Sequence, residues 1–214
     1  MSSVRSLKIG GKLVLAFAAL ILIILAIALF AIDRLALVES TAAEMRNNRV
    51  PSLTALANLD STALEHRVAV ARHVISQDAK TMAEVEATIG SLTDQMQKEL
   101  DAYRPLISDE AERQAFDKLT SAWSDYTRGT AALLTVSREN RTAEAMANYE
   151  GESRVAREAV ASMLDQITDM NVAAVKASGE HALGVYQGAR FALLTALVIG
   201  LVIAVAAVLL LVRS

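Results

Sequence analysis

The chain has 214 residues, with 21 Lys and Arg, 24 Asp and Glu, and a formal net charge of −3. All 24 acidic residues but only 17 of the basic ones lie in residues 33–190. That segment therefore carries a charge of −7 and is not expected to bind nucleic acid. The absence of cysteine excludes a thiol nucleophile.

Two apolar segments without any charged residue bound the acidic segment, at residues 13–32 and 191–212. As helices of about 20 residues they each cover about 30 Å, which is the thickness of the hydrocarbon core of a bilayer. Both are expected to be transmembrane helices. A cleavable signal peptide is the alternative for the first, but its apolar region would be shorter, about 7–15 residues.

Basic residues flank the outer ends of the two apolar segments, and they predict the orientation of the chain. Short flanks rich in Lys and Arg remain in the cytoplasm. Residues 1–12, a short tail, and residues 213–214 are thus predicted to lie in the cytoplasm, and residues 33–190 to lie outside it. The basic residues concerned are Arg5, Lys8, Lys12 and Arg213.

Residues 33–190 are expected to form an all-α, antiparallel four-helix bundle whose first and fourth helices continue into the two transmembrane helices. Turn signals occur near residues 76–78, 104–110 and 137–142. They divide the segment into helices of about 45, 25, 29 and 48 residues. Pro51 is expected to kink or relieve the first helix.

Apolar residues spaced by three and four predict one buried stripe on each helix of the bundle. The second, third and fourth helices carry, respectively, Met82, Val85, Ile89, Leu92, Met96, Leu100 and Tyr103; Phe116, Leu119, Trp123, Tyr126, Thr130 and Leu133; and Val160, Met163, Ile167, Met170, Ala174, Ala177, His181, Gly184 and Gly188. The first helix has a looser stripe of Leu35, Val38, Ala42, Met45, Leu56, Leu64, Val68, Ala71 and Ile75.

A second apolar row lies beside this stripe on the first helix, and it predicts a two-fold homodimer about that helix. The alternative is a core helix with a wide apolar face. The row consists of Leu56, Leu59, Ala63 and Val70.

No phosphate loop, nucleophile elbow or cofactor motif occurs, so we expect neither an enzyme nor a cofactor. His66 and His73 are interpreted as surface or interface residues. His181 lies far from both along the predicted bundle, so the three histidines do not predict a metal site.

Arginines are the strongest candidates for ligand binding. Arg67 and Arg72 are about 140° apart on one helix, so one small ligand cannot reach both in one chain. Arg67 of one chain and Arg72 of a second chain could meet across a dimer seam, where guanidinium groups suit a carboxylate. The same level of the bundle is predicted to contribute Tyr126, Thr130, Tyr149, Ser153 and Arg157.

Two structural interpretations compete with this site. Glu65, Glu150, Glu152 and Glu158 are close enough in the predicted helices to form ordinary surface ion pairs with the arginines. Tyr126 and Trp123 have the spacing of core residues, because aromatic side chains at helical spacing usually pack inside a bundle.

This layout of tail, span, helical bundle and span resembles the front half of a bacterial methyl-accepting chemotaxis protein with a four-helix-bundle sensor domain. Residues 64–72, Leu-Glu-His-Arg-Val-Ala-Val-Ala-Arg, are similar to the first helix of the aspartate and serine receptors. Arg67 and Arg72 match two of the ligand-binding arginines of that family, and Ser76 stands at the position of the third. Ile9–Leu13 and Val50–Leu53 also resemble the wider family.

The resemblance implies a chemoreceptor for a small organic acid or amino acid that signals through a small axial slide of the fourth helix. It further implies a periplasmic sensor domain at residues 33–190 of a protein in the bacterial inner membrane. Residues 213–214 would begin a cytoplasmic HAMP linker, followed by a signalling hairpin, with a kinase and a coupling protein as cytoplasmic partners. A sensor module of a histidine kinase or of a cyclic-nucleotide enzyme, and a structural bundle without a ligand, are the alternatives.

Overall fold

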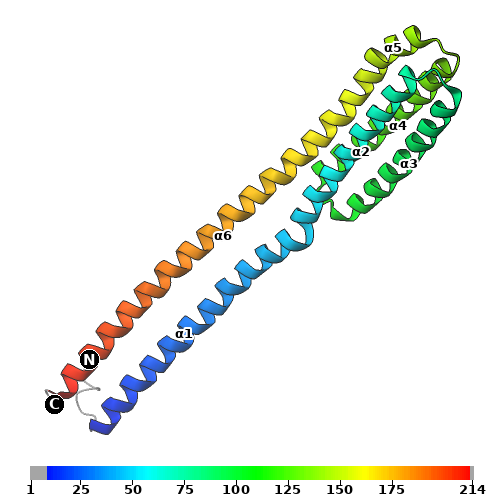
Figure 1. Ribbon diagram of the computed structural model, residues 1–214. Helices are drawn as coiled ribbons and strands as arrows, with labels where there is room; N and C mark the ends of the chain where they lie inside the picture. The colour runs from blue at the N-terminus through cyan, green and yellow to red at the C-terminus, as the bar shows by residue number, and fades with distance from the viewer. Residues whose placement is uncertain (1–8, 213–214) are drawn as a thin grey trace. The chain divides into compact units, whose positions relative to one another are not determined.

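The computed structural model describes residues 9–212, which are helical apart from short turns (Figure 1). The predicted all-α fold is confirmed. Arg5 and Lys8 of the predicted tail, and the predicted linker at residues 213–214, lie outside the described residues.

The chain forms six α-helices and two short helical segments in the described range. It divides into one compact unit of residues 45–176 and another made of the described residues before Met45 and after Lys176. In chain order the elements are α1 (Ile9–Glu44), the π-helix η1 (Met45–Arg49), α2 (Val50–Ile75), α3 (Ala79–Tyr103), the 3-10 helix η2 (Arg104–Leu106), α4 (Glu110–Arg138), α5 (Thr142–Glu150) and α6 (Glu152–Val212).

The unit of residues 45–176 is a four-helix bundle of α2, α3, α4 and the first part of α6 (Figure 1). α2 and α3 pack most closely, and α5 packs against α4 and α2. Helix capping by side chains sets two of the boundaries: Asp78 accepts a hydrogen bond from the Thr81 amide, and Asp109 accepts one from the Glu112 amide. The predicted lengths of 25 and 29 residues for the two middle helices are confirmed.

The π-helix η1 ends directly before α2, whose second residue is Pro51. Proline has no amide hydrogen, and its ring clashes with the carbonyl four residues earlier, so a regular α-helix cannot continue through it unchanged. The wider π-turn accommodates this defect, in agreement with the expectation that Pro51 relieves the first helix.

The fourth helix is interrupted, which corrects the prediction of one continuous helix. α5 ends at Glu150, and Gly151 has φ −96° and ψ −103° before α6 begins. A Cβ atom at residue 151 would lie 2.9 Å from the carbonyl oxygen of Ala147, so glycine permits a break that another residue would resist.

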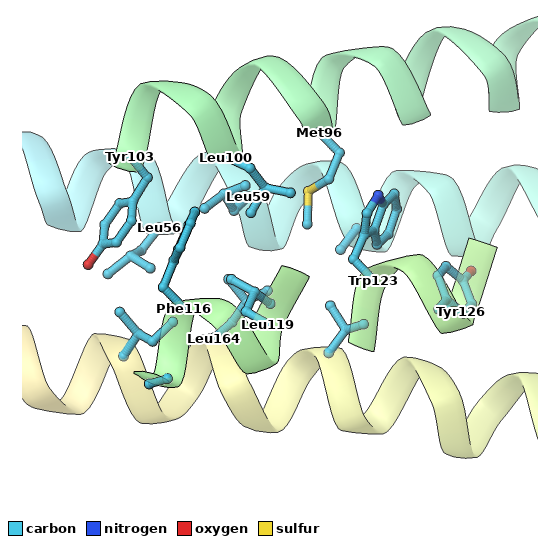
Figure 2. Close-up of a cluster of buried hydrophobic side chains, with 14 residues drawn as sticks. Leu56, Leu59, Met96, Leu100, Tyr103, Phe116, Leu119, Trp123, Tyr126 and Leu164 are labelled. Carbon is cyan, nitrogen blue, oxygen red and sulfur yellow. The ribbon is translucent and has the colours of Figure 1, made fainter. Parts of the chain in front are cut away.

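Two clusters of buried apolar side chains form the core of the bundle. Figure 2 shows the first, in which side chains from α2, α3, α4 and α6 meet. The second surrounds Val70, Ile89 and Leu133 nearer the α2–α3 turn. All members of the stripes predicted on α3 and α4 are buried, as the three-four spacing indicated.

The two faces of α2 are the reverse of the prediction. An inner row is buried within the chain, and an outer row at the same heptad spacing faces outward, with Leu64, Val68 and Ile75 at 55%, 52% and 63% exposure. The face assigned to the dimer is therefore core, because α3 and α4 cover it. The inner row is Leu56, Leu59, Ala63, His66, Val70 and His73, and the outer row is Ala57, Ser61, Leu64, Val68, Ala71 and Ile75.

The stripe on α6 is also shifted from the prediction. Leu164 and Asn171 are buried, whereas Met163 and Met170 are only partly buried. Val160 and Ile167 are buried as expected. A polar residue therefore occupies a core position of α6.

In the other unit, α1 and the second part of α6 each contain a stretch long and apolar enough to cross a membrane. Large apolar side chains are exposed along both, including Leu22 and Leu29 on α1 and Leu197 and Leu201 on α6. Apolar surface of this extent is stable only when another apolar phase covers it, and a bilayer supplies one.

Candidate ligand-binding site

A polar level separates the two apolar clusters of the bundle, and Arg67 is its centre. The Arg67 guanidinium donates hydrogen bonds to Ser153 Oγ at 2.9 Å and to the Tyr149 carbonyl oxygen at 2.8 Å. Its central carbon lies 3.5 Å from the centre of the Tyr149 ring, a stacked cation–π geometry. Three of the predicted site residues are thus in direct contact.

Arg157 lies one turn further along α6 and faces α2. Its side chain is only 14% exposed, and its one ion pair in the described chain is with Asp60 at 3.4 Å. The Arg157 Nε is buried without a hydrogen-bond partner. A largely buried guanidinium with a single ion pair and an unsatisfied N–H group favours the binding of an anion.

Tyr126, another predicted site residue, is buried beside these arginines. Its hydroxyl lies 3.2 Å from His66 Nδ1, and the rings of His66, Trp123 and Tyr126 pack edge-on or tilted against one another. Burial raises the pKa of Tyr126, and the positive charges of Arg67 and Arg157 act against that rise. Burial lowers the pKa of His66 to about 4, so His66 is neutral near pH 7.

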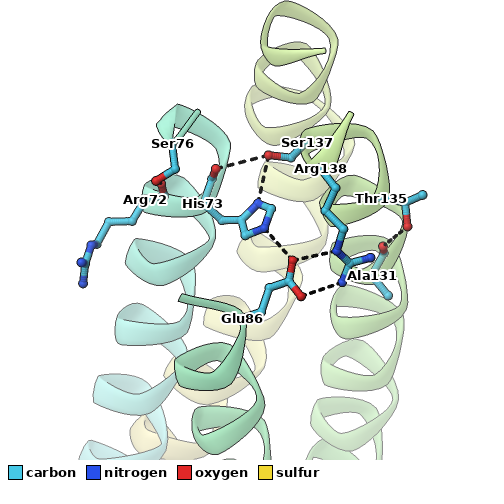
Figure 3. Close-up of polar contacts among 8 residues, drawn as sticks. All are labelled: Arg72, His73, Ser76, Glu86, Ala131, Thr135, Ser137 and Arg138. Atoms are coloured by element: carbon cyan, nitrogen blue, oxygen red, sulfur yellow. Dashed lines mark hydrogen bonds and ion pairs between the residues drawn. The ribbon is translucent and has the colours of Figure 1, made fainter. Parts of the chain in front are cut away.

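Thr130 and Arg72 complete the predicted set, with different outcomes. Thr130 is buried, and its Oγ1 is without a hydrogen-bond partner. Arg72 is exposed, and Figure 3 shows its side chain pointing away from the bundle. Within one chain Arg67 and Arg72 therefore do not meet, as their angular separation predicted.

Arg67 and Arg157 do not pair with the glutamates that the alternative named, but Arg157 does form an ion pair with the exposed Asp60. In residues 9–212, Arg67 pairs with Ser153 and Tyr149 rather than a glutamate, and Arg157 pairs with Asp60. Glu158 instead pairs with Arg154. Arg67 is thus held by contacts with α5 and α6, and Arg157 by its contact with α2.

His66 and His73 were expected at the surface or an interface, and that interpretation was wrong. Both are buried, at 1% and 0% exposure. Their burial could have been predicted from their spacing, because they continue the heptad of Leu59, Ala63 and Val70. Buried polar side chains are usually hydrogen-bonded, and Tyr126 and Ser137 of α4 provide the partners of the two histidines.

His73 belongs to a separate polar cluster near the α2–α3 turn (Figure 3). Its Nε2 lies 2.9 Å from Glu86 Oε1, and its Nδ1 lies 2.9 Å from Ser137 Oγ. Arg138 donates two hydrogen bonds to Glu86, and these bonds, with that of His73, lower the pKa of Glu86 to about 2 despite its partial burial. This cluster ties α2, α3 and α4 together.

The level around Arg67 and Arg157 presents two guanidinium groups, a tyrosine hydroxyl and hydroxyls of serine and threonine. Such donors bind carboxylates. In the part of the chain that the structure describes, no group of three or more His, Asp or Glu side chains could hold a metal ion.

Comparison with protein families gives a match over residues 6–186 to the model described as a four helix bundle sensory module for signal transduction. The match covers most of the chain and includes every residue of the candidate site. A comparison with curated proteins gave no match.

Proposed function

Because the chain belongs to the family of four-helix-bundle sensory modules for signal transduction, we propose that it is the sensor of a transmembrane chemoreceptor for a small organic acid or amino acid. The observation that carries this proposal is the pair of half-buried arginines, Arg67 and Arg157, with few compensating carboxylates. A ligand carboxylate accepts two parallel hydrogen bonds from a guanidinium group and supplies the missing charge.

The complete site is proposed to form between two copies of the chain. The outer row of α2 is largely exposed and, apart from Ser61, apolar at heptad spacing, which suits a coiled-coil contact with the same row of a second copy. Arg72 lies next to this row. In a two-fold dimer, Arg72 of the second copy would approach the ligand held by Arg67 and Ser153.

Signal transmission is proposed to run along α6. Ser153 and Arg157 stand at the beginning of a single helix that ends at Val212. A ligand that binds one position of α6 more tightly than another shifts the equilibrium between them by that difference in affinity. A small axial slide of α6, permitted by small residues such as Gly184 and Gly188, is the motion we propose.

The apolar stretches of α1 and α6 are proposed to cross the bacterial inner membrane. The bundle then lies in the periplasm, and both ends of the chain lie in the cytoplasm. Lys12, before the first stretch, supports this orientation through the excess of basic residues on the cytoplasmic side. A kinase and a coupling protein are the cytoplasmic partners proposed for the full receptor.

The test is a thermal-shift screen of the whole chain in detergent micelles against organic acids and amino acids. Trp123 is the only tryptophan and is buried in the bundle, so its fluorescence reports unfolding of this domain directly. We expect at least one carboxylate ligand to raise the midpoint of unfolding. Binding at 100 times Kd stabilises a protein by about 2.7 kcal/mol.

Variants then locate the site. If both Arg67→Ala and Arg72→Ala abolish the ligand-induced rise of the unfolding midpoint, the site lies at the dimer seam. If Arg67→Ala and Arg157→Ala abolish it and Arg72→Ala does not, the site lies within one bundle. Arg128→Ala is the control, because Arg128 is exposed and its only ion pair in the described chain is with Asp125. A screen without any hit argues for a structural bundle.

A further inference from the structure

A buried polar layer crosses the bundle where α3 ends and α4 begins. It consists of Tyr103 from α3, Glu112 from α4 and Asn171 from α6, at 0%, 2% and 1% exposure. Burying such groups is unfavourable unless each is hydrogen-bonded, and a carboxylate is the most costly of them. The three side chains of this layer therefore need hydrogen-bond partners within the bundle.

Hydrogen bonds to Glu112 provide that compensation. Oε1 accepts from the Tyr103 hydroxyl and from Asn171 Nδ2 at 2.8 Å, and Oε2 accepts from the amide and the hydroxyl of Ser108 at 2.8 and 2.9 Å. Burial alone would raise the pKa of Glu112, but these four donors outweigh burial and lower it. Glu112 is thus an ionised acceptor at the N-terminus of α4, where the helix dipole also favours a negative charge.

Asn171 is the only residue of α6 in this layer, and the layer determines how its amide is oriented. Nδ2 donates to the Glu112 carboxylate and to the Tyr103 hydroxyl at 2.9 Å, whose own proton is donated to Glu112. The Asn171 Oδ1 is left buried without a partner. A flipped amide would place this oxygen against the carboxylate, so one orientation is imposed.

The buried apolar positions of α6 do not distinguish one axial position of the helix from another, and Ser153, the other buried polar residue of α6, lies in its first turn. Val160, Leu164 and Ile167 are similar in size, so a slip of one turn would exchange one aliphatic side chain for another. The same slip would remove Asn171 and bring Ile167 or Ala174 to Glu112, and neither can donate a hydrogen bond. A single buried polar residue sets the register of a coiled coil in the same way.

We propose that the polar layer of Tyr103, Glu112 and Asn171 determines the axial register of α6 in the bundle. Arg49 of η1 reaches the same carboxylate indirectly, because it donates to Ser108 Oγ at 2.9 Å while Ser108 donates to Glu112. The proposal concerns the bundle without ligand and does not depend on the identity or existence of a carboxylate ligand.

Disulfide cross-linking in the full chain tests the register, and the natural sequence has no cysteine to interfere. Ala122 on α4 and Ala156 and Ala159 on α6 line one groove between these helices. The two pairs to compare are Ala122→Cys with Ala156→Cys, and Ala122→Cys with Ala159→Cys. The ratio of their oxidation yields measures the register of α6.

The layer is made apolar in a triple variant with Tyr103→Phe, Glu112→Leu and Asn171→Leu. In this variant we expect the ratio of oxidation yields to move toward equality by at least about fivefold. The midpoint of thermal unfolding should stay the same or rise. The matched control is Leu164→Ala, which weakens the adjacent apolar layer and should lower the midpoint without changing the ratio. If the triple variant loses the Trp123 signature of folding, Asn171→Ala gives the same readout. An unchanged ratio in the folded variant, or an equal change in Leu164→Ala, overturns the proposal.

Discussion

Replacement of Arg67 by alanine tests how much the contacts of this residue stabilise the bundle, without any ligand. The variant loses hydrogen bonds to Ser153 Oγ and the Tyr149 carbonyl and the stacking on the Tyr149 ring. Each hydrogen bond contributes about 0.5–1.5 kcal/mol, and the cation–π contact contributes about 0.5–1 kcal/mol at an exposed site. Because Arg67 is only half-buried, we expect Arg67→Ala to lower the free energy of unfolding by about 2 kcal/mol.

Arg72→Ala is the control for this test. Arg72 lies on the same helix, has the same side chain and is exposed, so Arg72→Ala should change the free energy of unfolding by less than about 0.5 kcal/mol. Arg67→Lys should fall between the two, because lysine keeps the charge but cannot present a planar fork to two acceptors.

Thermal unfolding of the full chain in micelles, followed by Trp123 fluorescence, provides the measurement. For a domain of this size, 2 kcal/mol corresponds to a decrease in Tm of about 4–8 °C. Equal decreases for Arg67→Ala and Arg72→Ala would refute the reasoning, since they would mean that α2 does not turn Arg67 toward α6. No decrease for Arg67→Ala would refute it as well.

Two further predictions follow from burial and charge. Leu119→Ala should lower the free energy of unfolding by about 2–5 kcal/mol because Leu119 is fully buried. Leu64→Ala should leave the free energy of unfolding of a single chain nearly unchanged, because Leu64 is exposed, but should weaken self-association in analytical ultracentrifugation. The pKa of Glu86 is lowered from 4.5 to about 2, chiefly by Arg138. The stability advantage of the natural chain over Glu86→Gln, about 1–2 kcal/mol, should therefore be complete above pH 4.5 and disappear as the pH falls toward 2 in urea titrations. A constant advantage across this range would contradict the assigned ion pair.

The stripes of α3 and α4 could be predicted residue by residue from the sequence. Each of these helices has one apolar face and a polar remainder, so only one orientation buries the apolar residues. The capping residues Asp78 and Asp109 act within a few residues of their own positions, and local chemistry of this kind is visible without a fold.

The orientation of α2 could not be predicted in the same way, because both of its rows have heptad spacing and apolar residues. Which row is buried depends on where α3 and α4 lie. The burial of His66 and His73 follows from the same choice, since their partners Tyr126 and Ser137 are 60 and 64 residues away in the chain. The break at Gly151 was missed because an isolated glycine is tolerated in a helix and does not by itself end one.

The sequence by itself determined the number of bundle helices, the buried faces of α3 and α4 and the two apolar stretches, because periodicity and hydrophobic length are properties of a continuous segment. Only the tertiary structure decided that Arg67 turns inward to Ser153 while Arg72 faces solvent, and that Asn171 reaches the buried Glu112. These contacts join residues far apart in the chain, and their geometry exists only once the helices have packed.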